Sequence, residues 1–216
     1  MTLPLISPLG DTGLTVRFGD LISTELGAAV TLIANAIRQS GIAGVVDVVP
    51  SYASLAVFFD PAITRYEKVH DQIASITSHQ QQPASTATTG ERRHVIRMTY
   101  DGDDLDFVAE RTRLTRENVI EIHSSAEYRV LVIGFVPGFA YMGELDARLR
   151  LPRRDAPRKR VPAGSVAIAE SQTGVYPSST PGGWHLIGHT AERMFDPRRE
   201  SPALLAVGDR VQFEPV

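Results

Sequence analysis

The chain has 216 residues, of which 43% are hydrophobic and 22% charged, and its formal net charge at pH 7 is −3. These proportions suit one large globular domain or two of about 100 residues, and the negative charge argues against nucleic acid as the main partner. The absence of cysteine excludes disulfides, thiolate metal sites and a cysteine nucleophile. No apolar run approaches the ~20 residues that span a bilayer, and the first residues lack a signal-peptide pattern. We therefore expect a cytoplasmic protein with no membrane partner.

The first 80 residues predict strands and helices in the order β-α-β-β-α. The strands alternate with period two or form short apolar runs, and the helices carry an apolar face. The expected elements are a strand over 13–18, a helix entered at Ser23, a hairpin of 45–49 and 55–59, and a helix opened by a capping box of Thr64 and Glu67. This order is most of a ferredoxin-like unit, which we predict for residues 1–80.

A polar segment separates this unit from the rest of the chain. Residues 79–90 contain no large apolar side chain and no periodicity, which is typical of a linker. We place the linker at 81–91 and a second domain at 92–216. The segment from His94 to Thr99 is compatible with the missing edge strand of the first domain or with the first strand of the second.

The second domain predicts two short helices followed by many short strands. The helices are expected over 105–113 and 115–123, and the strands over 128–133, 166–169, 184–187 and 210–213. Glycine and proline are dense between these strands, which favours a β-barrel or sandwich over a parallel sheet. The predicted fold class is therefore α+β.

Phosphate-binding loops, dinucleotide fingerprints and HExxH metal pairs are absent, so the unusual segments carry the functional hypothesis. The first is GFVPGFAYMG, residues 134–143, which includes Phe135, Gly138, Phe139 and Tyr141. Glycine lets backbone amides approach a ligand, and aromatic rings wall an apolar pocket. The alternative is a barrel corner packed by its own rings.

The second segment is strongly basic. Residues 148–160, RLRLPRRDAPRKR, hold seven basic side chains and one acidic side chain. Arginine suits the binding of carboxylates and phosphates, so an anionic substrate or nucleotide is the functional hypothesis, with Arg154 and Arg158 as the candidates. The alternative is a solvated face, and the two prolines predict an extended loop.

Two further glycine-rich segments follow. One contains Gly164, Ser165, Gln172 and Tyr176, and the other runs through Gly182, Gly183, Trp184 and His185 to Thr190. His185 and His189 are four residues apart on a predicted strand, which would place them on one face. With no third ligand nearby they do not predict a metal site, and His185 is instead an acid–base candidate.

Together these motifs resemble one known family. GFVPGFAYMG, LPRRDAPRKRVPAGSVAIA, QTGVYP and STPGGWHLIGHT occur in the order and spacing of the PxpB/KipI family, whose members include the smaller component of bacterial 5-oxoprolinase. That family is also described as allophanate hydrolase subunit 1 and corresponds to carboxyltransferase subdomains C and D. The likeness extends more weakly to SPLGDTGLTVRFGD and SYASLAVFFDP, and so covers nearly the whole chain.

The resemblance implies a ferredoxin-like amino-terminal domain, a cyclophilin-like β-barrel, and work as one subunit of an ATP-dependent 5-oxoprolinase, inactive alone. The implied partners are a homologous larger subunit (PxpC/KipA-like) and a third LamB/YcsF-type protein. ATP, with Mg²⁺ expected beside it, would bind this subunit, its partner or the seam between them. Two other roles stay open: a KipI-like inhibitor of a sensor histidine kinase, and a carboxyltransferase component of a biotin-dependent urea or allophanate pathway.

The candidate residues divide into two roles. Arg154, Arg158 and His185 are the catalytic candidates, since charge and a proton carrier are needed at an activated amide. The substrate-binding candidates are Phe135, Gly138, Phe139, Tyr141, Gly164, Ser165, Gln172, Tyr176, Gly182, Gly183 and Trp184.

Overall fold

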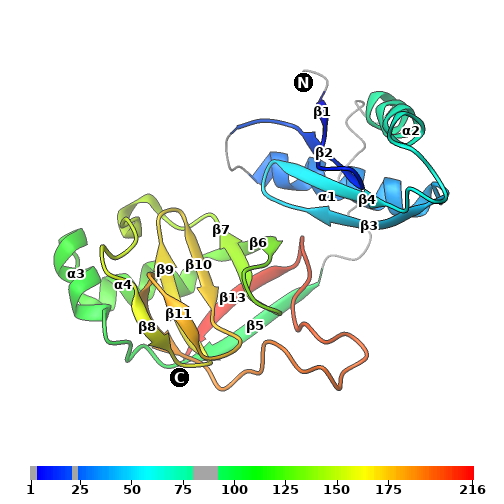
Figure 1. The fold of residues 1–216 in the computed structure, drawn as a ribbon. Helices are drawn as coiled ribbons and strands as arrows, with labels where there is room; N and C mark the ends of the chain where they lie inside the picture. Colours follow the sequence, from blue (N-terminus) through cyan, green and yellow to red (C-terminus); the bar gives the residue numbers. More distant parts are fainter. Residues whose placement is uncertain (1–3, 21–23, 80–91) are drawn as a thin grey trace. The chain divides into compact units, whose positions relative to one another are not determined.

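The computed structural model describes residues 4–20, 24–79 and 92–216, which form two compact units dividing between Gly90 and Glu91 (Figure 1). The predicted linker at 81–91 and the predicted helix start at Ser23 lie outside the described residues. The chain is of mixed α and β class, as predicted.

The first unit is a four-stranded antiparallel sheet with two helices. Its elements are β1 (Leu5–Pro8), β2 (Gly13–Arg17), α1 (Thr24–Gln39), β3 (Val45–Pro50), β4 (Ser54–Phe59) and α2 (Tyr66–His79). The sheet order is β1-β2-β4-β3. Alternate side chains of the strands, such as Leu14 and Leu55, are buried in one core with Val30 of α1 and Ile73 of α2. The helix and strand periodicities in the sequence therefore point to the same buried layer.

The edge position beside β2 is occupied by β1, a strand that the sequence analysis missed. Ile6 pairs with Val16 and Ser7 with Thr15. The segment that sequence left unassigned forms β5 (Arg93–Met98), which pairs in parallel with β13 of the second unit. Of the two alternatives, the second is therefore correct.

The start of α2 differs from the prediction. Thr64 Oγ1 is buried and has no hydrogen-bond partner, so the expected capping box with Glu67 is wrong. The amide of Thr64 instead donates to the carbonyl oxygen of Asp60 at 3.0 Å. The preceding turn, rather than a side-chain cap, leads into the helix.

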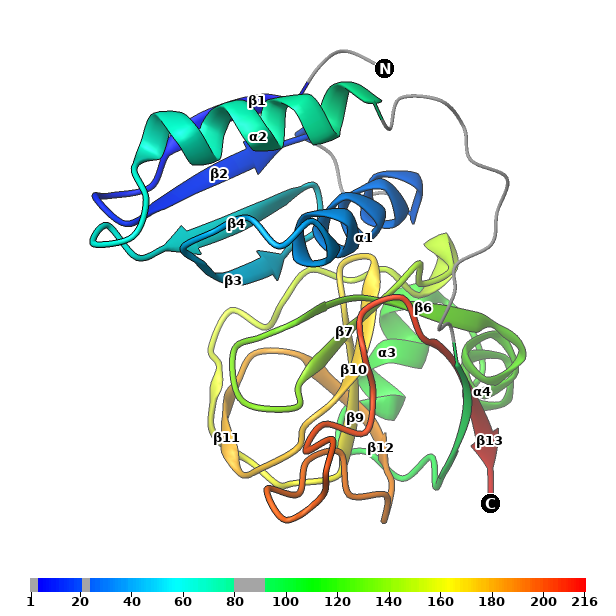
Figure 2. The same ribbon diagram turned by 90° about the vertical axis from the view of Figure 1, so that its right-hand side faces the viewer.

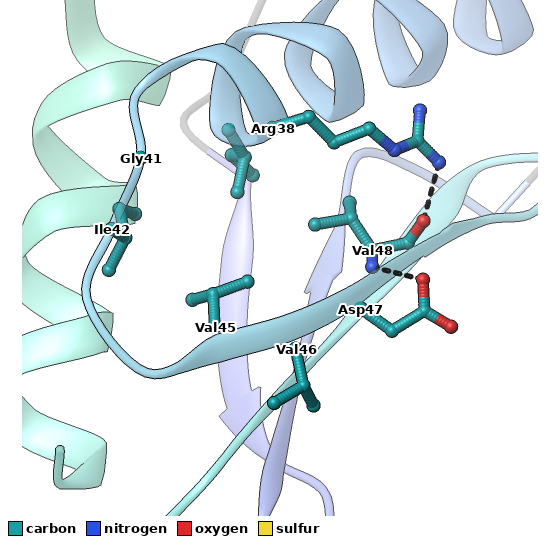
Figure 3. A pocket seen from close by; sticks show the side chains of 8 residues that line it. Arg38, Gly41, Ile42, Val45, Val46, Asp47 and Val48 are labelled. Atoms are coloured by element: carbon teal, nitrogen blue, oxygen red, sulfur yellow. Dashed lines mark hydrogen bonds between the residues drawn. The ribbon is translucent and has the colours of Figure 1, made fainter. Parts of the chain in front are cut away.

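A pocket of about 280 Å³ lies between the end of α1 and the edge strand β3 (Figure 3). At its rim Arg38 Nη2 donates to the carbonyl oxygen of Val48 at 2.6 Å, and the amide of Val48 donates to Asp47 Oδ1 at 2.7 Å. Both backbone groups of Val48 therefore have side-chain partners. Such partners blunt an edge strand against pairing with another chain.

The second unit is built on a seven-stranded sheet in the order β12-β9-β10-β7-β6-β13-β5 (Figure 2). A separate two-stranded sheet pairs β11 with β8. The elements after β5 are α3 (Leu105–Thr112), α4 (Arg116–Ser125), β6 (Glu127–Ile133), β7 (Ala140–Gly143), the 3-10 helix η1 (Ala147–Leu149), β8 (Arg158–Val161), β9 (Ser165–Ala169), β10 (Gln172–Val175), β11 (Thr180–Gly182), β12 (His185–His189) and β13 (Arg210–Pro215). The predicted helices and strands are all present, but β7, β8, β10, β11 and η1 were not predicted. The basic segment, expected to be an extended loop, thus ends in a strand.

The sheet closes on itself into a barrel where the chain leaves β5. Thr99 and His189 exchange two backbone hydrogen bonds of 2.9 Å. The contact is so close that a Cβ at Gly188 would overlap the carbonyl oxygen of Thr99, and one at Gly102 would overlap that of Leu186. Glycine at these two positions therefore permits the closure.

The barrel wall has two apolar faces. Val166 and Ile168 of β9 join the core cluster with Leu105 of α3, whereas Ala167 and Ala169 join a second cluster with Val161 of β8. Successive strand residues point to opposite faces, so the second cluster lies on the outer face of the wall, beneath β8. Among the described residues, no helix is both long and apolar enough to cross a membrane.

A hydrogen-bonded histidine lies inside the barrel core. His123 is fully buried, and its Nε2 lies 2.9 Å from Thr173 Oγ1, which itself donates to the carbonyl oxygen of Ala167. Nε2 must therefore carry the proton, and Nδ1 accepts from the Tyr100 hydroxyl at 2.7 Å. Burial lowers the pKa of His123 to about 3, so the ring is neutral in the folded protein.

The barrel seam predicts a sharp difference between two glycine substitutions. Gly188→Ala places a Cβ against the carbonyl oxygen of Thr99, while Gly134→Ala meets nothing closer than 3.9 Å. We expect Gly188→Ala to lower the free energy of unfolding by about 3 kcal/mol and Gly134→Ala by less than about 1 kcal/mol. Chemical denaturation measures both, and equal losses would contradict this account of the seam.

His123 predicts a pH dependence of stability. The unfolded chain protonates this histidine below a pH of about 6.5, whereas the folded chain resists until about pH 3. The stability that the neutral ring provides is therefore lost as pH falls, by up to about 1.4 kcal/mol per pH unit. Between pH 7 and pH 4, the free energy of unfolding should fall less steeply with decreasing pH for His123→Gln than for the wild type. An unchanged slope for His123→Gln would contradict this account.

Candidate functional site

Four predicted aromatic residues come together on the outer face of the barrel. The ring of Phe139 lies 4.8 Å from Tyr141, 5.2 Å from Tyr176 and 5.5 Å from Trp184, measured between centroids, and all three contacts are edge-on. Edge-on pairs add roughly 0.5–1.5 kcal/mol each beyond the area that they bury. Segments far apart in the sequence thus build one cluster, in which Phe139, Tyr176 and Trp184 are each at most 5% exposed.

The Tyr176 hydroxyl fixes the position of the second glycine-rich segment. A Cβ at Gly182 would overlap this hydroxyl, and the backbone N–H of Trp184 hydrogen-bonds with it. Burial raises the pKa of Tyr176, with the Trp184 hydrogen bond opposing that rise. Gly182 is thus needed for packing, and Gly183 offers its carbonyl oxygen to the amide of Arg154 at 2.8 Å.

Phe135 lies at the exposed edge of this cluster on an unusual turn. Its φ is +70°, and the amide of Val136 donates to the carbonyl oxygen of Gly134 at 2.9 Å. This is a γ-turn with a positive central φ, a rare and strained form. The ring is 61% exposed and meets Phe139 edge-on at 5.8 Å. Gly138, also at positive φ, lies close against Phe195.

The glycine-rich segment at 164–176 uses its backbone groups internally. The amide of Gly164 donates to the carbonyl oxygen of Tyr176, and the amide of Tyr176 donates to that of Ser165. Ser165 and Gln172 are buried in β9 and β10. The Gly164 amide is therefore already occupied by the fold and is not free to donate to a ligand.

Arg154 and Arg158 converge on one buried carboxylate, Asp104. Arg154 Nη1 and Arg158 Nη2 donate to its Oδ1 at 2.7 and 2.8 Å. Arg158 Nη1 approaches Oδ2 at 2.8 Å without the alignment of a hydrogen bond. The amide of Leu186 donates to Oδ2 at 2.7 Å. We call this group the Asp104 cluster.

The Asp104 cluster favours the ionised carboxylate. Burial by itself raises the pKa of Asp104, but the hydrogen bonds from Arg158 and the Leu186 amide, with the charges of both arginines, hold it below its usual range. Two cations face this one buried anion, and the exposed carboxylate of Asp103 also lies 4.0 Å from Arg158 Nη2. Arginine forks held in this way suit an anionic ligand.

His185 is buried at the edge of the same region. Its Nε2 lies 2.8 Å from the carbonyl oxygen of Pro152 and must therefore carry a proton. The ring stacks on Phe107 at 5.2 Å, and Nδ1 is buried without a hydrogen-bond partner. No group of the described chain therefore uses Nδ1.

The expectation that His185 and His189 share a face is wrong. The register of β12 against β9 shifts between Leu186 and Gly188, which is a β-bulge. The bulge breaks the period of two, so His185 is buried while His189 is exposed and pairs with Asp101 at 2.7 Å. Among the described residues, no group of three or more His, Asp or Glu could hold a metal ion.

Sequence reasoning missed Asp104, the residue that brings the two arginines together. An aspartate directly before a helix is typical of an N-cap, and Asp104 does occupy that position of α3. Its side chain, however, makes no cap hydrogen bond. No local signal in the sequence distinguishes this use from ordinary capping, because the partners lie 50 and more residues away.

Comparison with known proteins places this architecture in a family. Residues 4–205 match the family described as carboxyltransferase domain, subdomain C and D. The chain is 37% identical to the B subunit of 5-oxoprolinase from Bacillus subtilis (strain 168), over 96% of this chain and 91% of that protein. The chain belongs to this family.

Two other similarities extend the comparison. The crystal structure of TTHA0988 superposes with a TM-score of 0.84 and 38% identity over 94% of this chain. The chain spans only 40% of the TTHA0988 chain. A protein of Emericella nidulans named as a urea carboxylase is 31% identical over 43% of this chain, which is 8% of that protein.

The Asp104 cluster predicts unequal costs for its two arginines. Arg158 contacts both carboxylate oxygens and its side chain is 20% exposed, whereas Arg154 contacts one oxygen and is 32% exposed. Removing one partner of a buried ion pair costs up to about 3–5 kcal/mol. We expect Arg158→Ala to lower the free energy of unfolding by about 2–3 kcal/mol and Arg154→Ala by about 1 kcal/mol. Urea denaturation tests the order, and a greater loss for Arg154→Ala would contradict it.

Proposed function

We propose that the chain is a subunit of an ATP-dependent 5-oxoprolinase, which opens 5-oxoproline to L-glutamate in the cytoplasm. The observation that carries this proposal is the 37% identity with the Bacillus subtilis 5-oxoprolinase component along almost the full length of both chains. The two arginines of the Asp104 cluster support it, because the substrates 5-oxoproline and ATP are both anions.

The chemistry needs what these clusters offer. A five-membered lactam is a resonance-stabilised amide that water opens slowly. Transfer of the ATP γ-phosphoryl group to the lactam oxygen would form an activated imidate and ADP. Water then adds to the imidate carbon, the C–N bond breaks to free the amine and leave an acyl phosphate, and a second water hydrolyses the acyl phosphate to the carboxylate and phosphate. Developing negative charge at such a centre is stabilised by fixed cationic donors in a site that excludes water. Arg154 and Arg158 supply the charge in this proposal, and Phe139, Tyr141 and Trp184 exclude the water.

The site as proposed is completed by other chains. The Bacillus relative is, by its name, one of several subunits of 5-oxoprolinase and therefore a component of a larger assembly. The proposed partners are a homologous larger subunit and a LamB/YcsF-type third protein. The length of TTHA0988, in which this chain matches 40% of one polypeptide, supports a fused partner in some relatives.

We also assign the two units to fold families within this proposal. The first unit has the order β1-β2-β4-β3 with two helices, and we infer a ferredoxin-like fold whose edge strand comes from the amino terminus. The second unit, with its closed seven-stranded sheet and helices α3 and α4, supports a cyclophilin-like barrel.

A second candidate function is a carboxyltransferase component of a biotin-dependent urea pathway. It rests on the similarity to the urea carboxylase of Emericella nidulans, which covers less than half of this chain. The two functions differ in one requirement: the urea pathway needs biotin, and the oxoprolinase does not.

The proposed function predicts glutamate release only from the assembled proteins. This chain is purified alone and with its two proposed partners, and glutamate formed from 5-oxoproline is measured with and without ATP. We expect release only from the full mixture with ATP, and one ADP formed per glutamate. Release without ATP, or activity that depends on a biotinylated protein, would reject the oxoprolinase function.

A further inference from the structure

Asp104 makes interactions that its N-cap position before α3 does not require. It occupies the N-cap position of α3, where an aspartate side chain ordinarily accepts a hydrogen bond from the first turn, yet it makes none. Its backbone amide donates instead to the carbonyl oxygen of Leu186 at 2.9 Å, and its carboxylate accepts from the amide of the same residue. Both ends of Asp104 are therefore fixed to β12, with the carboxylate directed at the basic segment.

The carboxylate fixes the two guanidinium groups without consuming all their donors. Arg154 binds through Nη1 and Arg158 through Nη2. Arg154 Nε and Arg158 Nη1 remain buried without an aligned hydrogen-bond partner. Unsatisfied buried donors cost roughly 1–3 kcal/mol each, and in native proteins they mark sites with a reason to keep them.

The backbone beneath Arg154 is held independently of Asp104. The amide of Arg154 donates to the carbonyl oxygen of Gly183 at 2.8 Å, and His185 Nε2 holds that of Pro152 at 2.8 Å. Arg158 lies on β8, paired opposite Gly182. Loss of the Asp104 charge would therefore release the orientation of the two side chains and leave the loop in place.

We propose that Asp104 is the positioning residue of this site, which holds Arg154 and Arg158 in the orientation needed for an anionic group of the reaction. This inference rests on the proposed function. The shared chemistry is an oxyanion, either the carboxylate of 5-oxoproline or the phosphoryl group transferred from ATP. A buried ion pair is weak evidence for stability, since apolar replacements are often as stable. The presence of the cluster is therefore better explained by its control of the arginine orientations than by a contribution to stability.

Asp209 offers a matched control within the same unit. It too is buried, with a side chain only 2% exposed, and its carboxylate binds Arg92 at 3.3 Å and His94 at 3.0 Å. The amide of Ala206 also donates to it, at 2.9 Å. It touches none of the predicted site residues, so its loss changes stability through the same kind of interaction without disturbing the arginines.

The test compares Asp104→Asn, Asp104→Glu and Asp209→Asn in the assembled enzyme, with steady-state kinetics for each substrate and thermal unfolding of each variant. We expect Asp104→Asn to lower kcat/KM by about 10–100-fold, and Asp104→Glu, which keeps the charge, to recover part of the loss. Asp209→Asn should keep kcat/KM within about twofold at a comparable loss of thermal stability. A rise in KM for 5-oxoproline alone assigns the carboxylate, and a rise in KM for ATP or a fall in kcat assigns the phosphoryl group.

The possible outcomes distinguish failure of the positioning role of Asp104 from failure of the proposed function. If the wild-type mixture releases glutamate and Asp104→Asn behaves like Asp209→Asn, the positioning role is overturned and the proposed function stands. If the wild-type mixture releases none, the proposed function fails, and the role of Asp104 in it fails as well. Where Asp104→Asn is too unstable to assemble, Asp104→Glu is measured instead. Wild-type stability of Asp104→Glu, together with unchanged kinetics for both anions and an unchanged pH profile of activity, also counts against the proposal.

Discussion

Residues 99–104 run beside β12 and hydrogen-bond with it at both ends, Thr99 with His189 and Asp104 with Leu186. This pairing joins the two edges of the seven-stranded sheet at one bridge, so the sheet is nearly closed into a barrel. It depends on the lack of a side chain at Gly102 and Gly188, where the backbones approach too closely for a Cβ. The same pairing places Asp104, the residue before α3, at the edge of β12.

The outer face of the wall follows from that closure. Small residues of β9, Ala167 and Ala169, leave room for the rings of Phe139 and Trp184, and Val161 of β8 covers them. The basic segment crosses this layer, and its backbone is held by hydrogen bonds that do not involve its arginine side chains. Arg154 and Arg158 can therefore reach a carboxylate that lies 50 and 54 residues earlier in the chain. The pairing of residues 99–104 with β12 therefore determines both where the aromatic cluster packs and where the charged groups meet.

The sequence predicted what is local and missed what is not. The period-two alternation of β2, the apolar run of β4 and the apolar faces of α1 and α2 are strong enough to place these elements, and aromatic residues of the glycine-rich segments lie together in one cluster. β1 and β11 are four and three residues long, too short for a period to register. Asp104 resembles a helix cap, and the bulge in β12 that separates His185 from His189 arises from pairing with β9. Apart from β1, which forms a hairpin with β2, each of these depends on a partner distant in sequence.

A buried aspartate between two arginines is an unusual way to stabilise a fold, since desolvating three charged groups offsets most of their attraction. Such a cluster instead fixes orientation. A carboxylate whose own backbone is held by hydrogen bonds leaves an arginine guanidinium group few orientations. The unused Arg154 Nε and the unpartnered Nδ1 of His185 lie on the same two anchored segments. A fold selected for stability alone would have satisfied or removed them. Their presence beside two arginines is the reason that we propose the chemistry here rather than at the buried and fully paired His123.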